Sequence, residues 1–411
     1  MNIALLSVIY PFLFLSLFFE VFLILTYFEN ESKRRRGKLA TTAFPSVAVV
    51  VPCFNEEKTV GGTVESLLKL DYPKESLEII LVDDGSTDKT CEIFDSYKVH
   101  AHVRVIHKEN GGKHTALNVG IASTTSDYIA CLDADSFVSP HALKESIAHF
   151  DHPKIGAVTA SMSIYRPKSA LERMQQAEYL MGILLRHLLT TFNGLYVTPG
   201  PFTVYRRYVF DSLGAFRPAH NTEDMEIALR MQEAGWEIQN APRARVYTKA
   251  PKTVASLLKQ RVRWTTGFIR NGFDYKELFG NPRYGALGML ILPLGAISII
   301  SGIALFFLML LQTTNWLWNT AVQVFAVPLS YAIHIPDFDL FFVPANALIF
   351  FSIIATAITI VFIIEGARVS KTKASLGPAI VWYIPLYSIL APLWLIQSVS
   401  DVALGIRRGW R

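Results

Sequence analysis

Two long stretches of this 411-residue chain are almost free of charged residues, and they constrain its fold more strongly than any other feature. The first runs from Asn2 to Phe28 and contains a single charge, Glu20. The second lies between Arg283 and Asp337, where no Asp, Glu, Lys or Arg occurs. Because about 20 apolar residues are enough for a helix to cross a hydrocarbon layer of roughly 30 Å, both stretches predict membrane-spanning helices.

The N-terminal stretch is predicted to be a retained transmembrane helix over residues 1–28. A signal peptide carries its positive charge before a shorter apolar core, whereas here the basic run Lys33–Lys38 comes after the core. The positive-inside rule then places the basic linker, residues 29–45, and the polar region after it in the cytoplasm.

The C-terminal region, residues 284–411, is predicted to hold about three or four hydrophobic segments. If residues 284–336 cross the membrane once, the basic residues 368–373 face the cytoplasm, and the basic end of the chain lies outside unless the last segment is re-entrant. Two crossings would exchange the sides of these two basic clusters. We favour one full crossing, with Trp316–Tyr331 in or near the outer interface. The remaining hydrophobic segments are Leu340–Ile364 and Ala374–Ser400.

Composition and charge agree with a membrane protein. Hydrophobic residues make up 51% of the chain and charged residues 18%, which is too apolar for an ordinary soluble protein. The net charge of +5 arises beside hydrophobic segments, so it indicates membrane topology rather than nucleic-acid binding. The cysteines are odd in number and match no zinc pattern, which favours buried cytoplasmic thiols. They are Cys53, Cys91 and Cys131.

Between the apolar ends, residues 46–250 alternate short β-branched runs with helical patterns such as Lys58–Leu70. This alternation is typical of an α/β domain with a mostly parallel sheet and crossover helices. Ligands bind such sheets at the carboxyl ends of the strands. The predicted strands are Val47–Pro52, Leu77–Val82, Val103–Ile106 and Tyr128–Leu132.

Two amphipathic helices are predicted beside this domain. One covers residues 170–190, and the other, Thr253–Phe268, lies in an interfacial region of residues 251–283. In one interpretation both helices simply pack on the sheet. In the other they lie at the membrane interface and dock the domain against the bilayer.

Two acidic motifs come directly after predicted strands. Asp133 and Asp135 are separated by one residue, and Mg²⁺ or Mn²⁺ prefers carboxylate and phosphate oxygens as ligands. Such an ion neutralises the charge that develops on a departing diphosphate. A solvated loop is the alternative, because this pattern is common by chance. In the second motif, Asp83-Asp84, Asp84 is a candidate to accept hydrogen bonds from a nucleobase or ribose.

Lys113 ends the glycine-rich turn Asn110-Gly111-Gly112, whose backbone is able to approach a phosphate. A plain turn with a surface lysine is the alternative, and the lack of a Walker pattern excludes a P-loop ATPase. The histidines at 100, 102 and 107 lack the spacing of a metal site, so we interpret them as surface or packing residues.

Asp224 is the best candidate for a general base. Inverting transfer needs a carboxylate beside the acceptor hydroxyl, on the face opposite the departing group. Glu223 beside it would raise its proton affinity if both side chains were partly buried. The alternative is a role at a helix start, because Thr222 precedes a helical pattern over Met225–Ala234 and acidic residues are favoured there.

Trp264 offers a flat apolar face that suits the C–H face of a sugar. Gln260 and Arg263 lie at helical offsets from it and are candidates to reach an acceptor hydroxyl and a diphosphate. A membrane anchor on an interfacial helix is the alternative role for this segment.

Taken in order, these motifs resemble the membrane-embedded, processive members of glycosyltransferase family 2, which include poly-N-acetylglucosamine, hyaluronan, chitin and cellulose synthases. The likeness covers nearly the whole chain, and its length and layout are nearest to the first two. One departure is Lys249, which stands where relatives often carry an acid. The motifs are Pro52-Cys53-Phe54-Asn55-Glu56, Asp83-Asp84-Gly85-Ser86, NGGK at 110–113, DAD at 133–135, the segment Gly200–Arg207, TED at 222–224 and QRVRW at 260–264.

The resemblance implies a GT-A (Rossmann-like) cytoplasmic domain, a UDP-sugar donor, Mg²⁺ or Mn²⁺, inversion at the anomeric carbon and a pore made by the membrane helices. Asp224 becomes the base in a catalytic group with Glu223, Gln260, Arg263 and Trp264, which is also the acceptor platform. Asp133 and Asp135 become the metal and diphosphate site, and Gly200 and Pro201 line the acceptor channel. The implied nucleotide-sugar contacts are Pro52, Phe54, Asn55, Glu56, Asp83, Asp84, Lys113 and Asp133.

We therefore predict an inverting, processive β-glycosyltransferase of the plasma (inner) membrane that polymerises a UDP-sugar, with UDP-N-acetylglucosamine as the first candidate, and exports the product. The alternative is a single addition to a lipid acceptor, and a remote one is a transporter with a cytoplasmic regulatory domain. The expected partners are the donor, a growing polysaccharide or lipid-linked acceptor and the bilayer, but no nucleic acid. A small accessory membrane subunit or a homo-oligomer is left open.

Overall fold

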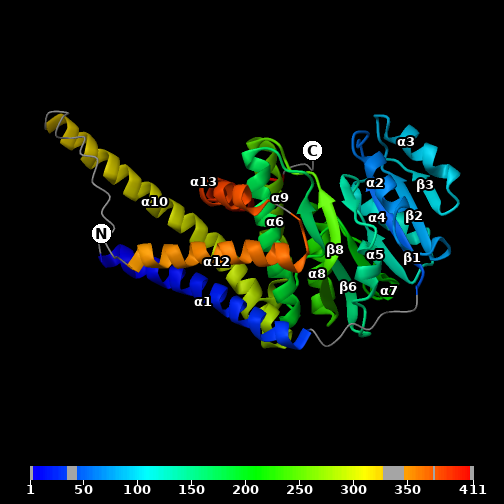
Figure 1. The fold of residues 1–411 in the computed structure, drawn as a ribbon, viewed down its shortest axis with the longest axis horizontal. Coiled ribbons are helices and arrows are strands. Elements are labelled where there is room, and N and C mark those ends of the chain that lie inside the picture. The colour runs from blue at the N-terminus through cyan, green and yellow to red at the C-terminus, as the bar shows by residue number, and fades with distance from the viewer. Residues whose placement is uncertain (1–2, 35–43, 327–346, 374, 408–411) are drawn as a thin grey trace.

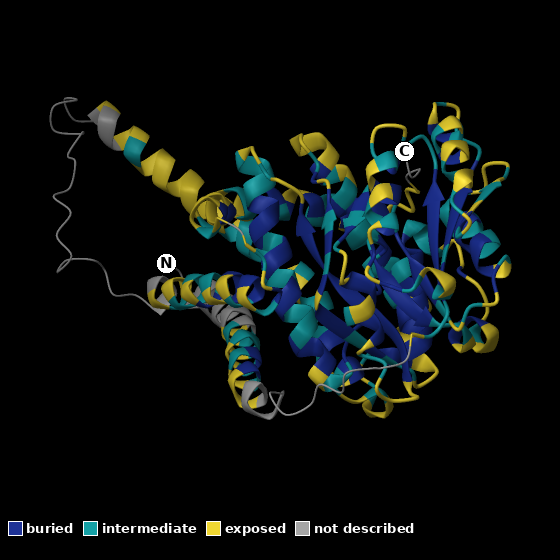
Figure 2. Cartoon of the chain, turned by 45° about the vertical axis from the view of Figure 1, so that its right-hand side comes forward, coloured by how far each residue is buried: buried dark blue, intermediate teal, exposed yellow. Residues whose placement is uncertain are grey.

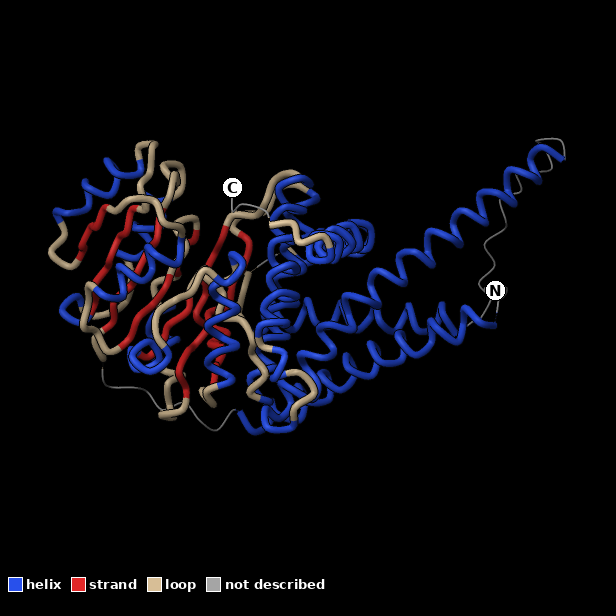
Figure 3. Tube along the Cα trace, turned by 180° about the vertical axis from the view of Figure 1, so that it is seen from behind, coloured by secondary structure: helices blue, strands red, loops and turns tan. Residues whose placement is uncertain are grey.

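The computed structural model describes residues 3–34, 44–326, 347–373 and 375–407. A sheet with helices on both faces forms one half of the molecule, and long apolar helices extend from one side of it (Figures 1 and 3). The two halves meet at α6 (Ala170–Leu189) and α9 (Val254–Asp274), the two helices predicted to be amphipathic.

Within the described residues the sheet has eight strands in the order β3-β2-β1-β4-β7-β6-β8-β5. The four predicted strands are confirmed and run parallel to one another. β7 is antiparallel to β4 and β6, and β5 is antiparallel to β8, but most pairings in the sheet are parallel, as predicted. The strands are β1 Val47–Cys53, β2 Leu77–Asp83, β3 Val103–His107, β4 Tyr128–Cys131, β5 Ser136–Val138, β6 Ile155–Ile164, β7 Thr203–Arg206 and β8 Glu237–Thr248.

Both faces of the sheet are buried, which explains why its strands read as continuous apolar runs. Along β1, Val47, Val49 and Val51 point into one core and Ala48 and Val50 into the other. The covering helices are α2 Val60–Leu68, α3 Thr90–Ser96, α4 Lys113–Ala122, α5 Ala142–Ile147, α7 Arg207–Leu213 and α8 Glu223–Glu233.

The helices α6 and α9 each begin with a capping box, at Ser169 and at Thr253. In such a box the side chain of the first residue and that of the third helical residue satisfy backbone N–H groups reciprocally, so the start of the helix is well fixed. α6 packs on β6 and β8 on one side and on the apolar helices on the other. α9 packs on α13 and on α8. Packing on the sheet is therefore confirmed for α6, and docking of the two helices against the bilayer stays a prediction.

Four long helices make up the described part of the apolar half. Three helices in the described part of the chain are long and apolar enough to cross a membrane: Leu287–Val322, which includes most of α10, Phe350–Val369 in α12, and Leu376–Ala403, which is α13. Exposed side chains cover the outer part of α10 (Figure 2). The four helices are α1 Ile3–Arg34, α10 Leu292–Ala326, α12 Ala347–Val369 and α13 Leu376–Ala403.

The predicted hydrophobic segments match these helices with shifted ends. The single helix α10 runs through Trp316, and residues 327–331 of the predicted interfacial segment lie outside the described residues. The same holds for residues 340–346 of the segment predicted over Leu340–Ile364, whose remainder is α12. The last predicted segment is α13.

α13 differs from the other three in direction, since Figure 1 shows it nearly end-on while α1, α10 and α12 lie across the view. It packs mainly along α6 and α9. Just before it, the carbonyl of Lys371 accepts a hydrogen bond from Arg245 of β8 at 3.4 Å. Just after it, the carbonyl of Ile406 accepts one from Arg270 of α9 at 2.7 Å. Both ends of α13 therefore lie against the sheet domain and its bordering helix.

Candidate active site

The loops after β1 and β2 are tied together at the carboxyl edge of the sheet. The backbone N–H of Asn55 donates to Ser86 Oγ at 3.0 Å, and Asn55 Oδ1 accepts from the N–H of Thr87 at 2.8 Å. The N–H of Glu56 donates to Thr90 Oγ1 at 2.9 Å. Asn55 has a positive φ of 54°, a conformation that asparagine tolerates better than most residues. The predicted nucleotide loop is thus held rigidly beside the DDGS motif.

Asp84 is buried and already has several hydrogen-bond partners. Its carboxylate accepts from the backbone N–H groups of Gly111 at 3.1 Å and Gly112 at 2.9 Å, and it pairs with Lys108. Those two N–H groups are consequently directed at Asp84, which holds the glycine-rich turn in place. In this structure Asp84 positions the turn that leads to Lys113, and its contact with a nucleobase or ribose stays a prediction.

Asp83 points to the other side of the sheet and belongs to a group that the sequence did not reveal. Cys91 Sγ donates to Asp83 Oδ2 at 2.9 Å, and His107 Nδ1 lies 3.3 Å from the same oxygen. Burial opposes ionisation of Asp83, but the hydrogen bonds from Cys91 and Ser86 hold its pKa below the ordinary value. The donor atoms of Asp83, Cys91 and His107 lie within 4.8 Å of one another, a spacing that a metal ion can bridge.

Lys113 brings two separate motifs together. Its Nζ lies 2.7 Å from Asp133 Oδ1 and 3.0 Å from Glu223 Oε1. Burial works against the charged amine, yet Asp133 and Glu223 raise the pKa of Lys113 well above its usual range. The same contact lowers the pKa of Glu223, although burial opposes this. Lys113 is therefore a largely enclosed ammonium group, 15% exposed, that joins the DAD and TED motifs, not a surface lysine.

Gly200 closes over this ion pair. A Cβ atom at position 200 would lie 2.8 Å from both carboxylate oxygens of Asp133 and 2.7 Å from Lys113 Nζ. The backbone at Gly200 therefore approaches the charged pair more closely than any other residue type would permit. This places the segment predicted to line the acceptor channel directly on the DAD motif.

Asp135 lies among other carboxylates without an equivalent partner lysine. Burial raises its pKa to about 6, and the nearby charges of Asp133 and Glu56 add to the effect. Its own polar contact is from Ser136 Oγ at 3.1 Å. Carboxylate oxygens grouped in this way form a ligand set that suits Mg²⁺ or Mn²⁺. The donor atoms present thus fit the divalent ion that the sequence predicts.

Asp224 stands in the first turn of α8, next to Glu223. Burial and the charge of Glu223 raise its pKa to about 6, so it ionises near neutral pH. Its backbone carbonyl accepts from Thr198 Oγ1 at 2.6 Å and from the N–H of the same residue at 3.1 Å. Thr222 occupies the N-cap position but makes no side-chain cap bond. Asp224 thus lies in the acidic first turn of a helix, as the helix-start interpretation expects, and its backbone is held by Thr198. Its role as a base stays a prediction.

On α9, the QRVRW motif presents two faces. Arg261 is buried and pairs with Glu178 of α6 at 2.6 Å, and it also donates to Gln260 Oε1 at 2.6 Å. Its guanidinium group lies 4.2 Å from the centre of the Trp264 ring, in a cation–π contact that fixes the indole. Trp264 itself packs against a small apolar cluster of Met162, Ile164, Tyr179 and Ala250. Arg263, on the other face, donates to the carbonyl of Asn221 at 3.3 Å, just before the TED motif.

The structure brings most of the predicted site residues to one edge of the sheet and to α9. The sequence did not single out Thr198 and Asn271, and it assigned no role to Arg261 of the QRVRW motif; the three residues position the predicted groups. Asn271 Nδ2 donates to Thr222 Oγ1 at 2.9 Å and so fastens α9 to the TED turn. Residues 260, 264, 267 and 271 lie on one face of α9 because they are three or four residues apart. This spacing from Gln260 and Trp264 could have indicated Asn271.

Comparisons with known proteins agree with this geometry. A family model described as glycosyltransferase like family 2 matches residues 45–267. Two curated relatives are poly-β-1,6-N-acetyl-D-glucosamine synthases from Staphylococcus epidermidis and Staphylococcus aureus, each 33% identical. Each match covers 63% of this chain and 63% of the relative, so the similarity spans less than two thirds of those proteins.

Among solved structures, a mannosyltransferase from Pyrobaculum calidifontis, in complex with GDP-Man and Mn²⁺, superimposes with a TM-score of 0.61 at 18% identity. The superposition covers 96% of this chain and 98% of that one. At this level of identity the likeness concerns the fold, and it confirms the predicted GT-A domain combined with apolar helices.

Proposed function

The chain belongs to glycosyltransferase family 2, and from this we propose that it is an inverting, processive β-glycosyltransferase that polymerises a UDP-sugar. The observation that carries the proposal is the position of Lys113, whose ammonium group contacts both Asp133 and Glu223. This contact joins Asp133 of the candidate diphosphate site to Glu223, the residue next to the candidate base Asp224.

Asp224 takes the proton from the acceptor hydroxyl in this proposal. The hydroxyl oxygen forms the new bond to the anomeric carbon, and the bond from that carbon to the diphosphate breaks with its electron pair leaving on UDP. Attack from the face opposite the leaving group inverts the configuration. A pKa near 6 makes Asp224 mostly ionised at neutral pH while it keeps a useful affinity for the proton.

Asp133 and Asp135 would hold the divalent ion, with Glu56 close to Asp135. When bound, the ion neutralises the charge that develops on the diphosphate. Lys113 contributes a fixed positive charge at the same place, and Arg263 lies close enough to lower the proton affinity of Asp224. The loops at Asn55 and at Asp83-Asp84 provide the walls for the nucleotide.

Trp264 is the proposed platform for the acceptor sugar. The contact with Arg261 and the packing against the small apolar cluster that includes Tyr179 hold the indole in one orientation. A fixed flat ring can orient a saccharide through dispersion contacts without demanding charge. Gly200, which lies against the Asp133 carboxylate, and Pro201 are the proposed lining of the acceptor channel.

The relatives' names suggest the product. Both are poly-β-1,6-N-acetyl-D-glucosamine synthases, so UDP-N-acetylglucosamine is the proposed donor and a β-1,6-linked polymer the proposed product. The apolar helices support a membrane location for the synthase, with the sheet domain on the cytoplasmic side where UDP-sugars occur.

Purified protein in lipid nanodiscs, incubated with Mg²⁺ and each labelled UDP-sugar in turn, tests the proposal by product sizing. We expect a long product from UDP-N-acetylglucosamine that a β-1,6-specific N-acetylglucosaminidase degrades. One labelled sugar per extracted lipid would instead support the single-addition alternative. No transfer from any UDP-sugar would overturn the assignment.

A further inference from the structure

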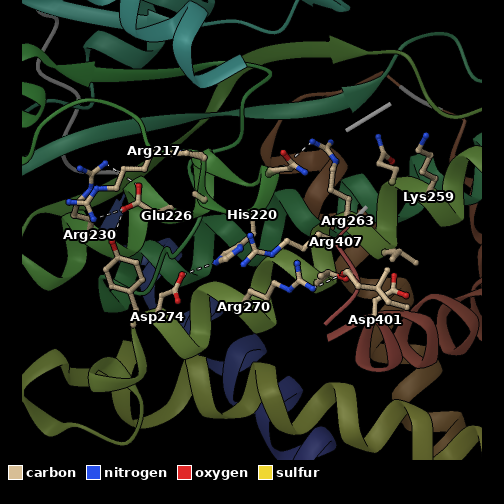
Figure 4. Close-up of a pocket in the computed structure, with 18 of the residues that line it drawn as sticks. Arg217, His220, Glu226, Arg230, Lys259, Arg263, Arg270, Asp274, Asp401 and Arg407 are labelled. Atoms are coloured by element: carbon tan, nitrogen blue, oxygen red, sulfur yellow. Dashed lines mark hydrogen bonds and ion pairs between the residues drawn. The ribbon is translucent and has the colours of Figure 1, made fainter. Parts of the chain in front are cut away.

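A cavity lies along α9, and Trp264 is not part of its lining. It has a volume of about 920 Å³ and includes neither Lys113 nor the DAD residues in its lining. α9 contributes Lys259, Gln260, Arg263, Thr266, Arg270 and Asp274, and the segment after α13 contributes Ile406 and Arg407. Figure 4 shows the labelled side chains of His220, Arg270 and Arg407 together in the middle of this cavity.

The cavity is rich in positive charge. Its lining includes six arginine or lysine residues and four carboxylates. Two of the carboxylates already have partners: Glu226 pairs with Arg230 at 3.0 Å and with Arg217 at 3.6 Å, and Asp274 pairs with His220 at 2.8 Å.

Three of the cations, in contrast, have no carboxylate partner among the residues that the structure describes. Arg270 donates to the carbonyl of Ile406, and Lys259 and Arg407 are exposed at the rim. They come from two elements that are far apart in the sequence, α9 and the segment after α13. An anion bound between these cations would contact both α9 and the segment after α13.

The cavity also contacts the turn that precedes the candidate base. Ala219, His220 and Asn221 have φ values of 42°, 55° and 64°, so three successive non-glycine residues are left-handed. Each such residue costs about 1–2 kcal/mol, and the turn therefore needs support from its surroundings. That support comes from the cavity lining, since His220 pairs with Asp274 and Arg263 donates to the carbonyl of Asn221.

We infer that this cavity binds a phosphate group, and that the bound phosphate links Arg270 and Lys259 to Arg407 beside the left-handed turn. Guanidinium groups match phosphate oxygens in a bidentate geometry, and several converging cations are the usual means of holding such an anion. The site shares Gln260 and Arg263 with the proposed catalytic group but includes neither Lys113 nor Asp133. Its effect on sugar transfer, through the turn that precedes Asp224, rests on the proposed function, whereas phosphate binding does not.

The phosphate can belong to a lipid headgroup or to a small soluble molecule, because the cavity lies on a helix that borders the apolar half. The test compares full-length protein in nanodiscs of phosphatidylcholine with protein in nanodiscs containing phosphatidylglycerol, counting retained phosphatidylglycerol by native mass spectrometry. Inorganic phosphate is titrated into the phosphatidylcholine nanodiscs, with thermal unfolding as the readout.

In the double variant Arg270→Gln/Arg407→Gln, the amount of retained phosphatidylglycerol or the phosphate-induced thermal shift should be at least fivefold smaller than in wild type. Lys259→Gln, an exposed position that tolerates substitution, should weaken the same signal if the double variant does not fold. Arg243→Gln, an exposed arginine of β8 outside the cavity, should behave as wild type. Retention of phosphatidylglycerol assigns a lipid source, and a shift with inorganic phosphate alone assigns a soluble one.

Equal binding of both probes by wild type, Lys259→Gln and the double variant would overturn the inference, as would no binding of either probe by wild type. Both readouts are independent of sugar transfer. A protein that binds phosphate at this site but transfers no sugar would leave the inference intact and count against the proposed function only.

Discussion

At the scale of single residues, the central feature of the site is the ion pairing of Lys113 with two carboxylates, Asp133 and Glu223. Lys113 pairs with Asp133 and Glu223 and favours their ionised forms. Burial, together with the charge of Asp133 near Asp135 and of Glu223 near Asp224, raises the pKa of Asp135 and of Asp224 to about 6 each. Groups with perturbed pKa values in one site are candidates for chemical roles. Asp224 is suited to a base and Asp135 to a metal ligand.

Replacing Asp224 with Asn keeps its size and removes its basic site. Transfer should fall by about 10²–10⁴-fold, the usual cost of a lost general base. UDP binding, measured by calorimetry, should change little because the Thr198 contacts use the backbone of residue 224. Near-normal turnover would exclude the catalytic role, since asparagine serves as well as aspartate at a helix start.

The metal assignment predicts a linked dependence on chelator and pH. EDTA should abolish transfer, and Mg²⁺ or Mn²⁺ should restore it, but not in Asp135→Asn. Because Asp135 must lose its proton to bind the ion and its pKa is about 6, metal affinity should decline as the pH falls below about 6 and level off above it. Full activity in EDTA, or metal affinity that is the same at pH 5 and pH 8, would contradict this assignment.

Gly200→Ala tests the contact over the ion pair. The added Cβ would lie within 2.8 Å of Asp133 and Lys113 atoms, so the pair must shift. A displacement of about 1 Å at a reacting site can cost about 10²-fold in rate, and we expect a loss of that order with unfolding temperature nearly unchanged. Gly377→Ala, at a helical position with open space around it and no positive φ, serves as a control for the substitution itself. Equal activity of the two variants would show that Gly200 is merely a loop residue.

Site residues such as Asp133, Asp135 and Asp224 could be predicted because each belongs to a recognisable motif. For Asp133 and Asp135, the sequence also showed that the motif follows a strand. Thr198 and Arg261 could not be predicted in the same way, because their roles depend on contacts far along the chain. The partner of Arg261, for example, is Glu178 on another helix. The grouping of Asp83 with Cys91 and His107 was missed for the same reason, since β3 brings His107 beside the end of β2.

At the scale of helices and strands, the parallel strands β1 to β4 could be predicted from the sequence, whereas β5 to β8 could not. β1 to β4 are β-branched runs that stop at turn residues. β6, in contrast, reads IGAVTASMSI, is buried throughout and contains small and hydroxyl side chains, so it shows neither alternation nor a strong apolar run. Its place in the sheet is set by pairing with β7 and β8, which no local pattern reveals.

The two faces of α9 lead to a prediction about Trp264. Truncation to Ala should leave UDP affinity near wild type and strongly reduce elongation, because the indole contacts the acceptor sugar and not the donor. Phe, which is smaller but still flat, should retain part of the activity and give shorter products. Product sizing on gels, with wild type alongside, decides the question: unchanged product length in both variants would mean that Trp264 only anchors α9.

At the scale of the whole molecule, the topology left open by the charges depends on the placement of α13. A helix of its length would extend about 42 Å at 1.5 Å per residue, enough to cross a bilayer. Yet the chain contacts β8 just before α13 and α9 just after it. Two ends held on the same domain are incompatible with a simple crossing, so we propose that α13 lies along the membrane interface. Of the four described apolar helices, α1, α10 and α12 then cross, and the basic residues before and after α13 share the cytoplasmic side.

Cysteine labelling tests this arrangement directly. Lys373→Cys and Leu404→Cys, placed one at a time in a chain whose three native cysteines are replaced, lie on either side of α13, and Leu404 is 73% exposed. A membrane-impermeant maleimide should label both positions in inverted vesicles and neither in intact cells. Asn319→Cys, near the outer end of α10, should show the reverse pattern and verify the sidedness of the vesicles. If residue 373 and residue 404 were labelled from opposite sides, α13 would be a crossing helix. The cavity formed by Arg270 and Arg407 would then be divided by the membrane, which the contact between Arg270 and Ile406 makes physically implausible.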